Sequence, residues 1–308
     1  MEAQSTLLDF RPISIEEKKK YESYLWESVP RGCEYSFANL WMWGEQKITF
    51  FAGHAVLFSR FGDRFIYPYP IGTGDKRAVL DAILEDAAAR GIDWRFSGLL
   101  PHEKEELDSL YPGRFTFVFN ENSQDYVYAI DDLADLAGRK YHSKRNHCKR
   151  FETAHPSYVI EPIGEENLPK IKEMAEKWYR EKEETSDSDF GMEMVAIERA
   201  LSHYRALELE GLALTVDGEV LAMTIGNHMT EDTFDVNFEK ARADVEGAYA
   251  MINRSFARYI REKYPQVRFL NREEDMGIEG LRRAKLSYYP HHRVEKYRAM
   301  LAEGIHEI

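Results

Sequence analysis

The sequence predicts a duplicated α/β fold, and three observations lead to this prediction. A chain of 308 residues with 44% hydrophobic content can bury more than one core, because domains of roughly 100–150 residues are the commonest size. Each half has a β-rich middle that is followed by a helix and another strand, as expected for a repeated α/β unit. A basic segment, Arg139–Arg150, separates the halves. We therefore predict two domains, residues 1–135 and 157–308, joined by a basic linker helix over residues 136–156.

Two helices of the first half carry clear end signals. One helix begins at Ser14, because Ser14 and Glu17 have the spacing of a capping box. Another, Asp75–Ala89, is followed by Gly91, a typical C-cap residue. The other predicted elements of this half are strands at Leu7–Ile13, Lys47–Ala52, Ala55–Arg60, Phe65–Tyr69, Asp93–Ser97, Phe115–Asn120 and Tyr126–Ile130, and a helix at His102–Leu110.

The second half follows the same order of elements. A polar loop, Thr185–Asp189, is expected between its first two helices. The predicted helices are Asn167–Lys182, Glu193–Glu208, Ala248–Glu262 and Ile278–Leu286. The predicted strands are Tyr158–Pro162, Leu212–Val216, Val220–Met229, Thr233–Glu239, Val267–Leu270 and a segment near His292–Tyr297.

Composition limits the cellular setting and the partners. The net charge of -13 argues against general binding of nucleic acid or anionic membranes, although it leaves room for a local basic site. The N-terminus lacks the pattern of a signal peptide. The longest apolar stretch, Leu212–Ile225, is interrupted by Asp217–Glu219, as in a hairpin. We therefore expect a cytoplasmic protein without stable membrane insertion.

The cysteines and histidines do not form a metal signature. Cys33 and Cys148 lack the paired spacing of a zinc site, so we expect reduced thiols, with a single disulfide as the alternative. His291 and His292 are neighbours on a strand, where adjacent side chains point to opposite faces. No metal ligands are predicted.

The basic segment Arg139–Arg150 stands out against an acidic chain. It holds six basic residues and no acidic one, which leaves -19 on the rest of the chain. At about 100° per residue its charges spread around a helix, so we expect it to cross an inter-domain cleft or to bind an anionic ligand instead of packing flat on one core. A solvated linker helix is the alternative. The candidate ligand-binding residues of this segment are Lys144, Arg145 and Lys149.

The segment Asn271–Pro290 concentrates charge just past a predicted strand, where α/β sheets usually carry their chemistry. Its carboxylates include Glu274 and Asp275, and either can serve as a general base or as an anchor for an ammonium group. Three adjacent carboxylates, Glu273 to Asp275, should raise the pKa of at least one. The alternative for Asp275 or Glu273 is a helix cap.

The same segment offers cations and a hydroxyl. Arg282 and Lys285 lie three residues apart, on one helical face, and can hold a phosphate or carboxylate. Ion pairs with Glu273 and Asp275 are their alternative. Tyr288 can protonate a leaving group, or it can be a core tyrosine. Asn271 and Arg283 complete the candidate substrate-binding set of this segment.

These residues carry a family resemblance. The block from Asn271 through Asp275, Gly277, Gly280 and Lys285 to Pro290 resembles the C-terminal domain of phosphatidylglycerol lysyltransferases, in the DUF2156 group. The stretches Ser36–Trp41 and Lys140–Phe151 look like the same family. The resemblance implies a tandem GCN5-related N-acetyltransferase (GNAT) fold, with two mixed, mostly antiparallel sheets flanked by helices. The implied relatives include Fem peptidyltransferases, which use aminoacyl-tRNA.

The resemblance also implies acyl or aminoacyl transfer from an activated donor to an amine or hydroxyl in the inter-domain cleft. The lysyltransferases carry a large membrane-spanning region that is not found in this sequence, so the acceptor stays open between a lipid, a peptide, an amino sugar and a small amine. The alternative function is a non-catalytic GNAT-like protein that binds a small anionic metabolite.

The donor is also open between acyl-CoA and aminoacyl-tRNA. A GNAT site receives the pyrophosphate of CoA at a helix N-terminus, and the matching residues here are Arg242, Gly247 and Ala248. The spacing is one residue too long for the family's phosphate loop, and Asp244 and Glu246 add repulsive charge. Apart from the donor, no cofactor is predicted. A tRNA would be held by the basic segment together with Arg282, Arg283 and Lys285, with Tyr141 as a stacking surface for a terminal base.

Overall fold

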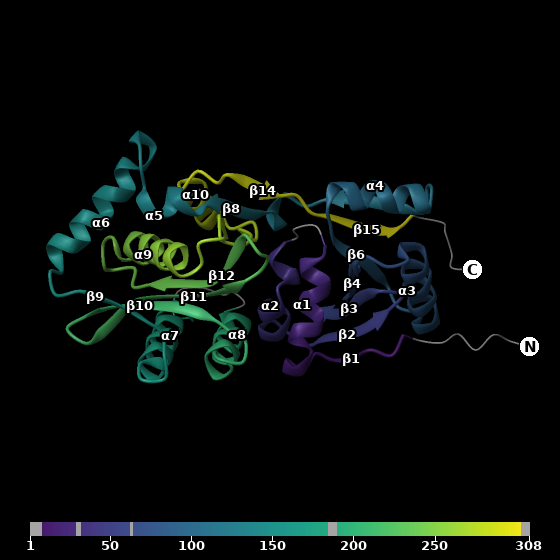
Figure 1. Ribbon diagram of the computed structural model, residues 1–308, viewed down its shortest axis with the longest axis horizontal. Helices are drawn as coiled ribbons and strands as arrows, with labels where there is room; N and C mark the ends of the chain where they lie inside the picture. Colours follow the sequence, from purple (N-terminus) through teal and green to yellow (C-terminus); the bar gives the residue numbers. More distant parts are fainter. Residues whose placement is uncertain (1–7, 29–31, 62–63, 184–189, 303–308) are drawn as a thin grey trace, which may run out of the picture. The chain divides into compact units, whose positions relative to one another are not determined.

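The computed structural model of the chain describes residues 8–28, 32–61, 64–183 and 190–302 (Figure 1). Contacts divide the chain into two compact units. The first contains residues 1–124 together with 294–308, and the second contains residues 125–293. This grouping differs from the predicted division at both ends of the second unit. Residues 125–156 belong to the second unit, and residues 294–308 belong to the first.

The first unit is built on a mixed sheet with the strand order β1-β2-β3-β4-β6-β15-β7, and β5 pairs with β3. All pairs are antiparallel except β4 with β6. The strands are β1 (Arg11–Pro12), β2 (Gln46–Phe51), β3 (His54–Phe61), β4 (Arg64–Pro68), β5 (Ile71–Gly72), β6 (Trp94–Leu99), β7 (Phe115–Phe119) and β15 (Tyr297–Leu301). The helices are α1 (Lys18–Trp26), α2 (Phe37–Met42), α3 (Lys76–Arg90) and α4 (Pro101–Leu110), with short 3-10 turns η1 (Ile15–Glu17), η2 (Cys33–Tyr35) and η3 (Glu121–Ser123).

The predicted helix ends of the first unit are confirmed. Ser14 and Glu17 form a capping box before α1. Asp75 caps α3 by accepting a hydrogen bond from the backbone N–H of Ala78 at 3.0 Å, and Gly91 ends the helix with φ of 60°. The first strand, Arg11–Pro12, is shorter than the predicted Leu7–Ile13.

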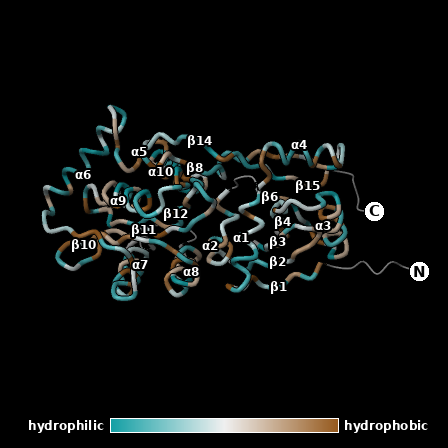
Figure 2. Tube along the Cα trace, in the orientation of Figure 1, coloured by the Kyte–Doolittle hydropathy of each residue, from teal (hydrophilic) through white to brown (hydrophobic). Residues whose placement is uncertain are grey.

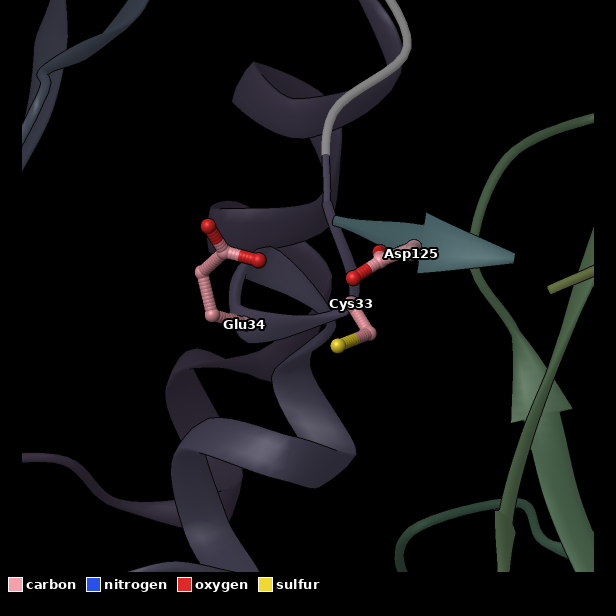
Figure 3. Close-up of side chains that lie close together, drawn as sticks. All are labelled: Cys33, Glu34 and Asp125. Carbon is pink, nitrogen blue, oxygen red and sulfur yellow. The ribbon is translucent and has the colours of Figure 1, made fainter. Parts of the chain in front are cut away.

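The C-terminal segment completes the sheet of the first unit. Strand β15 lies between β6 and β7 and is antiparallel to both. Lys296, just before it, is 5% exposed, and its Nζ lies 2.7 Å from the carboxylate of Glu34. Figure 3 shows Glu34 and Cys33 on η2, and it also draws Asp125, the first residue of β8.

The second unit has a seven-stranded sheet in its described residues, with the order β14-β8-β13-β12-β11-β10-β9. Helix α9 packs on β10, β11 and β12, and α7 packs on β11; Figure 1 shows α9 on one side of these strands and α7 and α8 on the other. The strands are β8 (Asp125–Ala129), β9 (Val159–Pro162), β10 (Glu210–Val216), β11 (Glu219–His228), β12 (Thr233–Ala241), β13 (Phe269–Asn271) and β14 (His292–Val294). The helices are α5 (Ile130–Asp135), α6 (His142–Ala154), α7 (Leu168–Glu183), α8 (Phe190–Ser202), α9 (Ala248–Lys263) and α10 (Glu279–Leu286), with a 3-10 turn η4 (Arg139–Tyr141). The predicted polar loop 185–189 lies outside the described residues.

Each of the two sheets contains one strand from the opposite half of the sequence. In each unit, four strands in antiparallel pairs are followed by a parallel neighbour, β6 or β13. The next position is filled from the other half of the chain, by β15 in the first unit and by β8 in the second. The prediction that Tyr126–Ile130 completes the first half is therefore wrong, because its strand, β8, pairs with β13.

The basic segment also differs from its prediction, because it packs on one core. Tyr141, Cys148 and Phe151 are fully buried, and α6 packs against α9. The charged residues occupy the remaining faces, and Figure 2 shows α6 mainly in hydrophilic colour. Two buried side chains within α6, together with Tyr141 just before it, are enough to attach a short helix whose remaining positions are almost all polar.

Two further observations concern cysteines and helix hydropathy. Cys33 and Cys148 are buried, and neither forms a disulfide. Among the described helices, none combines the length and the apolar character that crossing a membrane requires.

Candidate functional site

Strands β12 and β13 of the second unit diverge after a short parallel pairing. They pair over three positions, ending at Asp235 opposite Asn271. Strand β13 stops there, whereas β12 continues to Ala241. The edge of β12 from residue 236 onward is therefore not paired with β13, and its backbone groups on that side can bind a ligand.

One face of this divergence carries a buried polar cluster, which we call the amide–carboxylate cluster. Its members are Asp125, Asn227, Asp235, Asn237 and Asn271, each at most 6% exposed. Asn271 donates to the carboxylate of Asp125 at 2.8 Å, and Asn237 donates to that of Asp235 at 3.2 Å. Asn227 lies opposite Asp235 in the antiparallel register, so the two side chains share a face.

This face is the one covered by α7 and α8. Lys240 of β12 forms an ion pair with Glu193 of α8 at 2.6 Å, and it lies opposite Met223 of β11. Strand β11 alternates regularly from Met223 to Asn227, while β12 accommodates an extra residue in the same interval. Asn227 and Asp235 therefore point to the same side of the sheet as Lys240.

The other face of the divergence is crossed by an ion pair, which we call the Arg272 bridge. Arg272 follows β13 directly, and its Nη2 lies 2.8 Å from Oε1 of Glu239 on β12. Glu239 also accepts a hydrogen bond from Asn253 of α9 at 3.0 Å. Both side chains of the ion pair are nearly buried, at 13% and 10% exposure. A cation and an anion thus lie across the opening between the two strands.

Tyr288 and Lys144 adjoin the Arg272 bridge. The Nζ of Lys144 lies 3.9 Å from the ring centroid of Tyr288, and the guanidinium of Arg272 lies 5.0 Å from the same centroid. Burial, and then the neighbouring Arg272, lower the pKa of Lys144. Burial raises the pKa of Tyr288, so its hydroxyl stays protonated at neutral pH. The structure thus brings together two predicted site residues, Tyr288 and Lys144.

Asp275 has a different environment from the one predicted. It is fully buried and accepts hydrogen bonds from the hydroxyl of Tyr126 at 2.6 Å, from the backbone of Gly277 at 2.8 Å and from Arg282 at 2.7 and 3.1 Å. These contacts, with Arg282 first, lower its pKa to about 2. The expectation of a raised pKa is wrong for Asp275, because cationic and hydrogen-bonding partners outweigh its acidic neighbours. A carboxylate held in this way is a weak base and a strong structural anchor.

Lys285 and Arg282 likewise serve the loop. Lys285 is 7% exposed and donates to the backbone carbonyl of Arg272 at 2.6 Å and to that of Glu274. Arg282 is bound to Asp275 by two nitrogens, as in the alternative predicted from the sequence. Neither cation is arranged as the predicted anion clamp. Together they hold the turn after β13, where Glu273 and Met276 have positive φ, and they orient Arg272.

Two of the remaining predicted residues of this segment, Glu274 and Arg283, are less enclosed than Asp275. Glu274 is half-buried, and its backbone carbonyl is the one that Lys285 binds. Arg283 is 76% exposed, 3.9 Å from Glu279 on the same helix. Asn271 belongs to the amide–carboxylate cluster. In addition to the Asp125 contact, its side-chain oxygen accepts from the backbone N–H of Glu273 at 2.8 Å.

In the basic segment, only Lys144 reaches the divergence. Arg145 donates to the carbonyls of Leu136 and Gly138, which ties η4 to the end of α5. Lys149 is exposed and forms no ion pair with the described residues. Sequence spacing does not predict these different contacts, because each depends on the elements that pack against α6.

The predicted CoA phosphate site, at the start of α9, is already occupied by protein groups. Arg242 is paired with Asp244 and with Glu219, both at 2.6 Å. A Cβ on Gly247 would lie 2.4 Å from the backbone oxygen of His147 in α6, so the two backbones are in close contact. Ala248 is fully buried. The carboxylate of Glu246 pairs with Arg150 at 2.7 Å. This helix N-terminus is therefore acidic and partly covered.

Sequence reasoning missed most of the polar residues at the divergence. Arg272, Glu239 and Asn253 of the Arg272 bridge were not predicted, nor were Asp125 and the polar residues of β11 and β12. A signal was present in Thr233–Glu239, where three polar residues, at 235, 237 and 239, alternate with Phe234, Val236 and Phe238 in a strand flanked by apolar ones. Polar residues on a strand buried on both faces indicate a site.

A comparison with known families adds an independent observation. Residues 27–300 match the family described as phosphatidylglycerol lysyltransferase, C-terminal. The chain belongs to this family. The resemblance predicted from Asn271–Pro290 is thereby confirmed. A search of curated proteins gave no match.

Solved structures show how the fold of this family member is shared. A conserved protein of unknown function from Bacteroides thetaiotaomicron is 35% identical, with a TM-score of 0.92 over 96% of this chain and 100% of that chain. L-PGS from Bacillus licheniformis is 15% identical, with a TM-score of 0.66 over 93% and 92%. A tandem GNAT protein from the clavulanic acid biosynthesis pathway is 10% identical, with a TM-score of 0.51 over 97% and 100%. The predicted tandem GNAT fold, with two mixed sheets flanked by helices, is confirmed.

Proposed function

We propose that this protein transfers an aminoacyl group from an aminoacyl-tRNA to a nucleophilic amine or hydroxyl. The observation that carries the proposal is the amide–carboxylate cluster beside the divergence of β12 and β13. A buried group of acceptors at this point suits a donor whose acyl group bears an ammonium. An acetyl group would bring no charge to match it.

The chemistry of the cluster favours an ammonium ligand. Asp235 and Asp125 are fully buried carboxylates, and the side-chain oxygen of Asn227, a residue 4% exposed, has no hydrogen-bond partner among the described residues. An ammonium group presents three N–H donors and a positive charge. Binding it would satisfy the buried oxygen of Asn227 and would place a positive charge beside the two carboxylates.

The divergence supplies a place for the reacting carbonyl. Backbone groups of β12 beyond Asp235 are not paired with β13, and fixed N–H groups of this kind stabilise an oxyanion more strongly than water does. The nucleophile forms a bond to the ester carbon, and the ester C–O bond breaks. The hydroxyl of Tyr288 can donate its proton to the leaving ribose oxygen and regain the proton lost by the nucleophile. In this proposal Asp275 is a positioning residue, because it anchors the turn that carries Arg272.

Three observations weigh against acyl-CoA as the donor. Arg242 is already paired with two carboxylates, the start of α9 is packed against α6, and Asp244 and Glu246 are acidic. A pyrophosphate at this helix end would have to displace ion pairs and approach negative charge. The family's description names lysyl transfer, which supports an aminoacyl donor. The acceptor class is identified by the transfer assay that follows.

A transfer assay with labelled donors tests the proposal. Purified protein is incubated with radiolabelled lysyl- and alanyl-tRNA and a panel of acceptors: phosphatidylglycerol vesicles, peptides, amino sugars and small amines. Release of thiol from acetyl-CoA is measured in parallel. We expect label to move from tRNA to one acceptor class, without comparable thiol release.

A variant connects this activity to the cluster. Asp235→Asn should lower kcat/KM for the aminoacyl donor by about tenfold or more, since it removes the charge that faces the ammonium. Glu166→Gln, at an exposed position, is the matched control and should retain activity. Consumption of acetyl-CoA alone, or full activity in Asp235→Asn, contradicts the proposal. Ligand binding without turnover of any donor would favour the alternative of a non-catalytic binding protein.

A further inference from the structure

A basic hollow lies at the start of the basic segment in the second unit. It is open to solvent and is lined by Arg139, Lys140, His142, Ser143 and Arg145. The first four of these residues are exposed, and the guanidinium of Arg145 is fixed by two backbone carbonyls. The hollow therefore has a rigid base and a cationic rim.

The cations of this surface are available to an anionic partner. Lys140 lies 3.2 Å from Asp132, but both side chains are exposed, at 45% and 40%, and such surface pairs are weak. Arg139 forms no ion pair with the described residues. Lys149 lies seven residues after His142 and so on the same face of α6, about 10 Å further along the helix axis. The cations thus extend from the hollow along one side of α6.

An exposed aromatic ring adjoins these cations. Tyr289 is 47% exposed, and the Nζ of Lys140 lies 5.5 Å from its ring centroid. The ring contacts buried Tyr141 edge-on, with centroids 5.6 Å apart. Tyr141, which the sequence suggested as a stacking surface, is fully buried. Tyr289 is the ring in this neighbourhood that a nucleobase can reach.

We propose that this surface, consisting of the basic hollow, Lys149 and Tyr289, binds the single-stranded 3′ end of an RNA. Phosphates would contact Arg139, Lys140 and Lys149, and one base would stack on Tyr289. Cations that follow the backbone, together with an aromatic ring for a base, form the usual site for single-stranded nucleic acid. The proposal rests on the proposed function, because the RNA end would be that of the aminoacyl-tRNA donor.

A bilayer with anionic lipids is the competing polyanion, and the surface suits it less. Peripheral binding to a membrane needs apolar side chains that enter the interface beside the basic ones. No large apolar side chain of η4 or α6 is exposed in the described structure, and the exposed Ile278 and Leu286 belong to the α10 segment, outside the lining of the basic hollow. A hollow with one exposed ring fits a phosphate and a base better than a flat lipid surface.

Equilibrium binding of a short RNA tests the proposal without requiring transfer. The probe is a single-stranded RNA of about eight nucleotides that ends in CCA, carries no amino acid and is labelled at its 5′ end. Fluorescence anisotropy with the full chain gives Kd. Arg139→Ala/Lys149→Ala should weaken binding and reduce the slope of log K against log salt by about 1.4, for two phosphates. Tyr289→Ser should weaken binding by about fivefold or more, and Tyr289→Phe, which keeps the ring, should bind like the wild type.

Lys170→Ala/Lys172→Ala is the matched control, because it removes two exposed positive charges from α7. Equal losses in this control and in Arg139→Ala/Lys149→Ala would overturn the proposal, since binding would then follow net charge alone. Unchanged RNA binding in both Arg139→Ala/Lys149→Ala and Tyr289→Ser would also overturn it. So would a loss of sedimentation with phosphatidylglycerol vesicles in these two variants without a loss of RNA affinity. Thermal unfolding of each variant checks that it is folded.

The same measurements separate this inference from the proposed function. RNA binding that depends on Arg139, Lys149 and Tyr289, in a protein that transfers nothing, would keep the inference and reject the transferase. Transfer from aminoacyl-tRNA with unchanged KM in both Arg139→Ala/Lys149→Ala and Tyr289→Ser would keep the transferase and reject this surface.

Discussion

The two units share one strand order but differ at their parallel strand pair. In the first unit, β4 and β6 stay paired through Pro68 and Ser97, and the backbone N–H of Tyr69 still bonds to the carbonyl of Ser97 at 2.9 Å. In the second, β12 and β13 separate after Asp235 and Asn271. The parallel strand pair thus stays hydrogen-bonded to its end in the first unit, whereas in the second unit β12 continues beyond the last residue paired with β13.

The side chains at these two strand pairs also differ, in being aromatic in the first unit and polar in the second. Aromatic rings fill the first pair: the ring of Trp94 lies edge-on to those of Tyr67 and Phe96, with centroids 5.4 and 5.0 Å apart. Buried amides and carboxylates fill the second, in the amide–carboxylate cluster and the Arg272 bridge. Aromatic packing stabilises a core, whereas buried polar groups are costly unless they serve a site or a specific network. Among the described residues of these two strand pairs, the buried polar side chains that a ligand could contact therefore lie in the second unit.

The largest expected effect concerns a buried carboxylate of the first unit. Asp86 is fully buried and accepts from Arg90 at 2.8 and 3.0 Å, from the hydroxyl of Tyr67 at 2.6 Å and from the backbone of Leu8 at 2.9 Å. Asp86→Asn should reduce the free energy of unfolding by about 3 kcal/mol, because it leaves Arg90 without its counter-ion. Chemical denaturation measures the loss.

Asp108→Asn, on the exposed face of α4, is the control and should change stability by less than about 0.5 kcal/mol. RNA affinity of Asp86→Asn, measured where the variant is still folded, should equal that of the wild type. A loss of RNA affinity in folded Asp86→Asn would contradict the assignment of RNA binding to the second unit alone.

Asp275→Asn should have the next largest effect, and it depends on pH. The folded state lowers the pKa of Asp275 to about 2 from 3.8. A depressed folded pKa contributes stability that is present above pH 3.8 and is lost as pH falls through about 2. At neutral pH the variant should therefore be less stable than the wild type by about 2 kcal/mol, and this difference should shrink between pH 4 and pH 2.

Glu279→Gln, 85% exposed in α10, controls for removal of a carboxylate in the same segment and should show no such window. Transfer activity should fall in Asp275→Asn at every pH at which it is folded, because the turn that holds Arg272 loses its anchor. A pH–rate profile that loses only an acidic limb, with stability unchanged, would instead restore Asp275 as a base.

Much of the fold was predictable because its signals are local. The capping box at Ser14, the Asp75 cap and the Gly91 C-cap each depend on residues close in the sequence, and each is confirmed. The exchange of β8 and β15 was not predictable, since a strand's own residues do not specify which sheet edge it joins. The packing of α6 was missed because two buried residues within it, with Tyr141 just before it, give a weak periodic signal among mostly polar positions.

The charged segment of the sequence lies beside the candidate site, whereas the contacts of its residues differ from those expected. The turn after β13 does lie at a polar divergence of strands, as its density of charge suggested. The roles of Asp275, Arg282 and Lys285 were assigned as if their charges faced a ligand. Each is instead satisfied by groups that come from distant parts of the sequence, Tyr126 among them, or by backbone carbonyls. Sequence spacing cannot distinguish a charge that is compensated within the fold from one that is available to a ligand.

The smallest expected effect concerns Arg242, and it bears on how far the second unit resembles a CoA-dependent GNAT. Its ion pairs with Asp244 and Glu219 are near the surface, with partners 65% and 55% exposed, so Arg242→Ala should cost at most about 1 kcal/mol of stability. With an aminoacyl-tRNA donor, kcat/KM should stay within about twofold of the wild type, because less than about 0.5 kcal/mol of transition-state binding is at stake. Steady-state kinetics with both donor classes measure this. A tenfold rise in KM for an acyl-CoA, with aminoacyl-tRNA inactive, would assign the pyrophosphate to Arg242. The start of α9 would then be a cofactor site despite its acidic neighbours, and the second unit would differ from the first by a bound thioester instead of by an ammonium pocket.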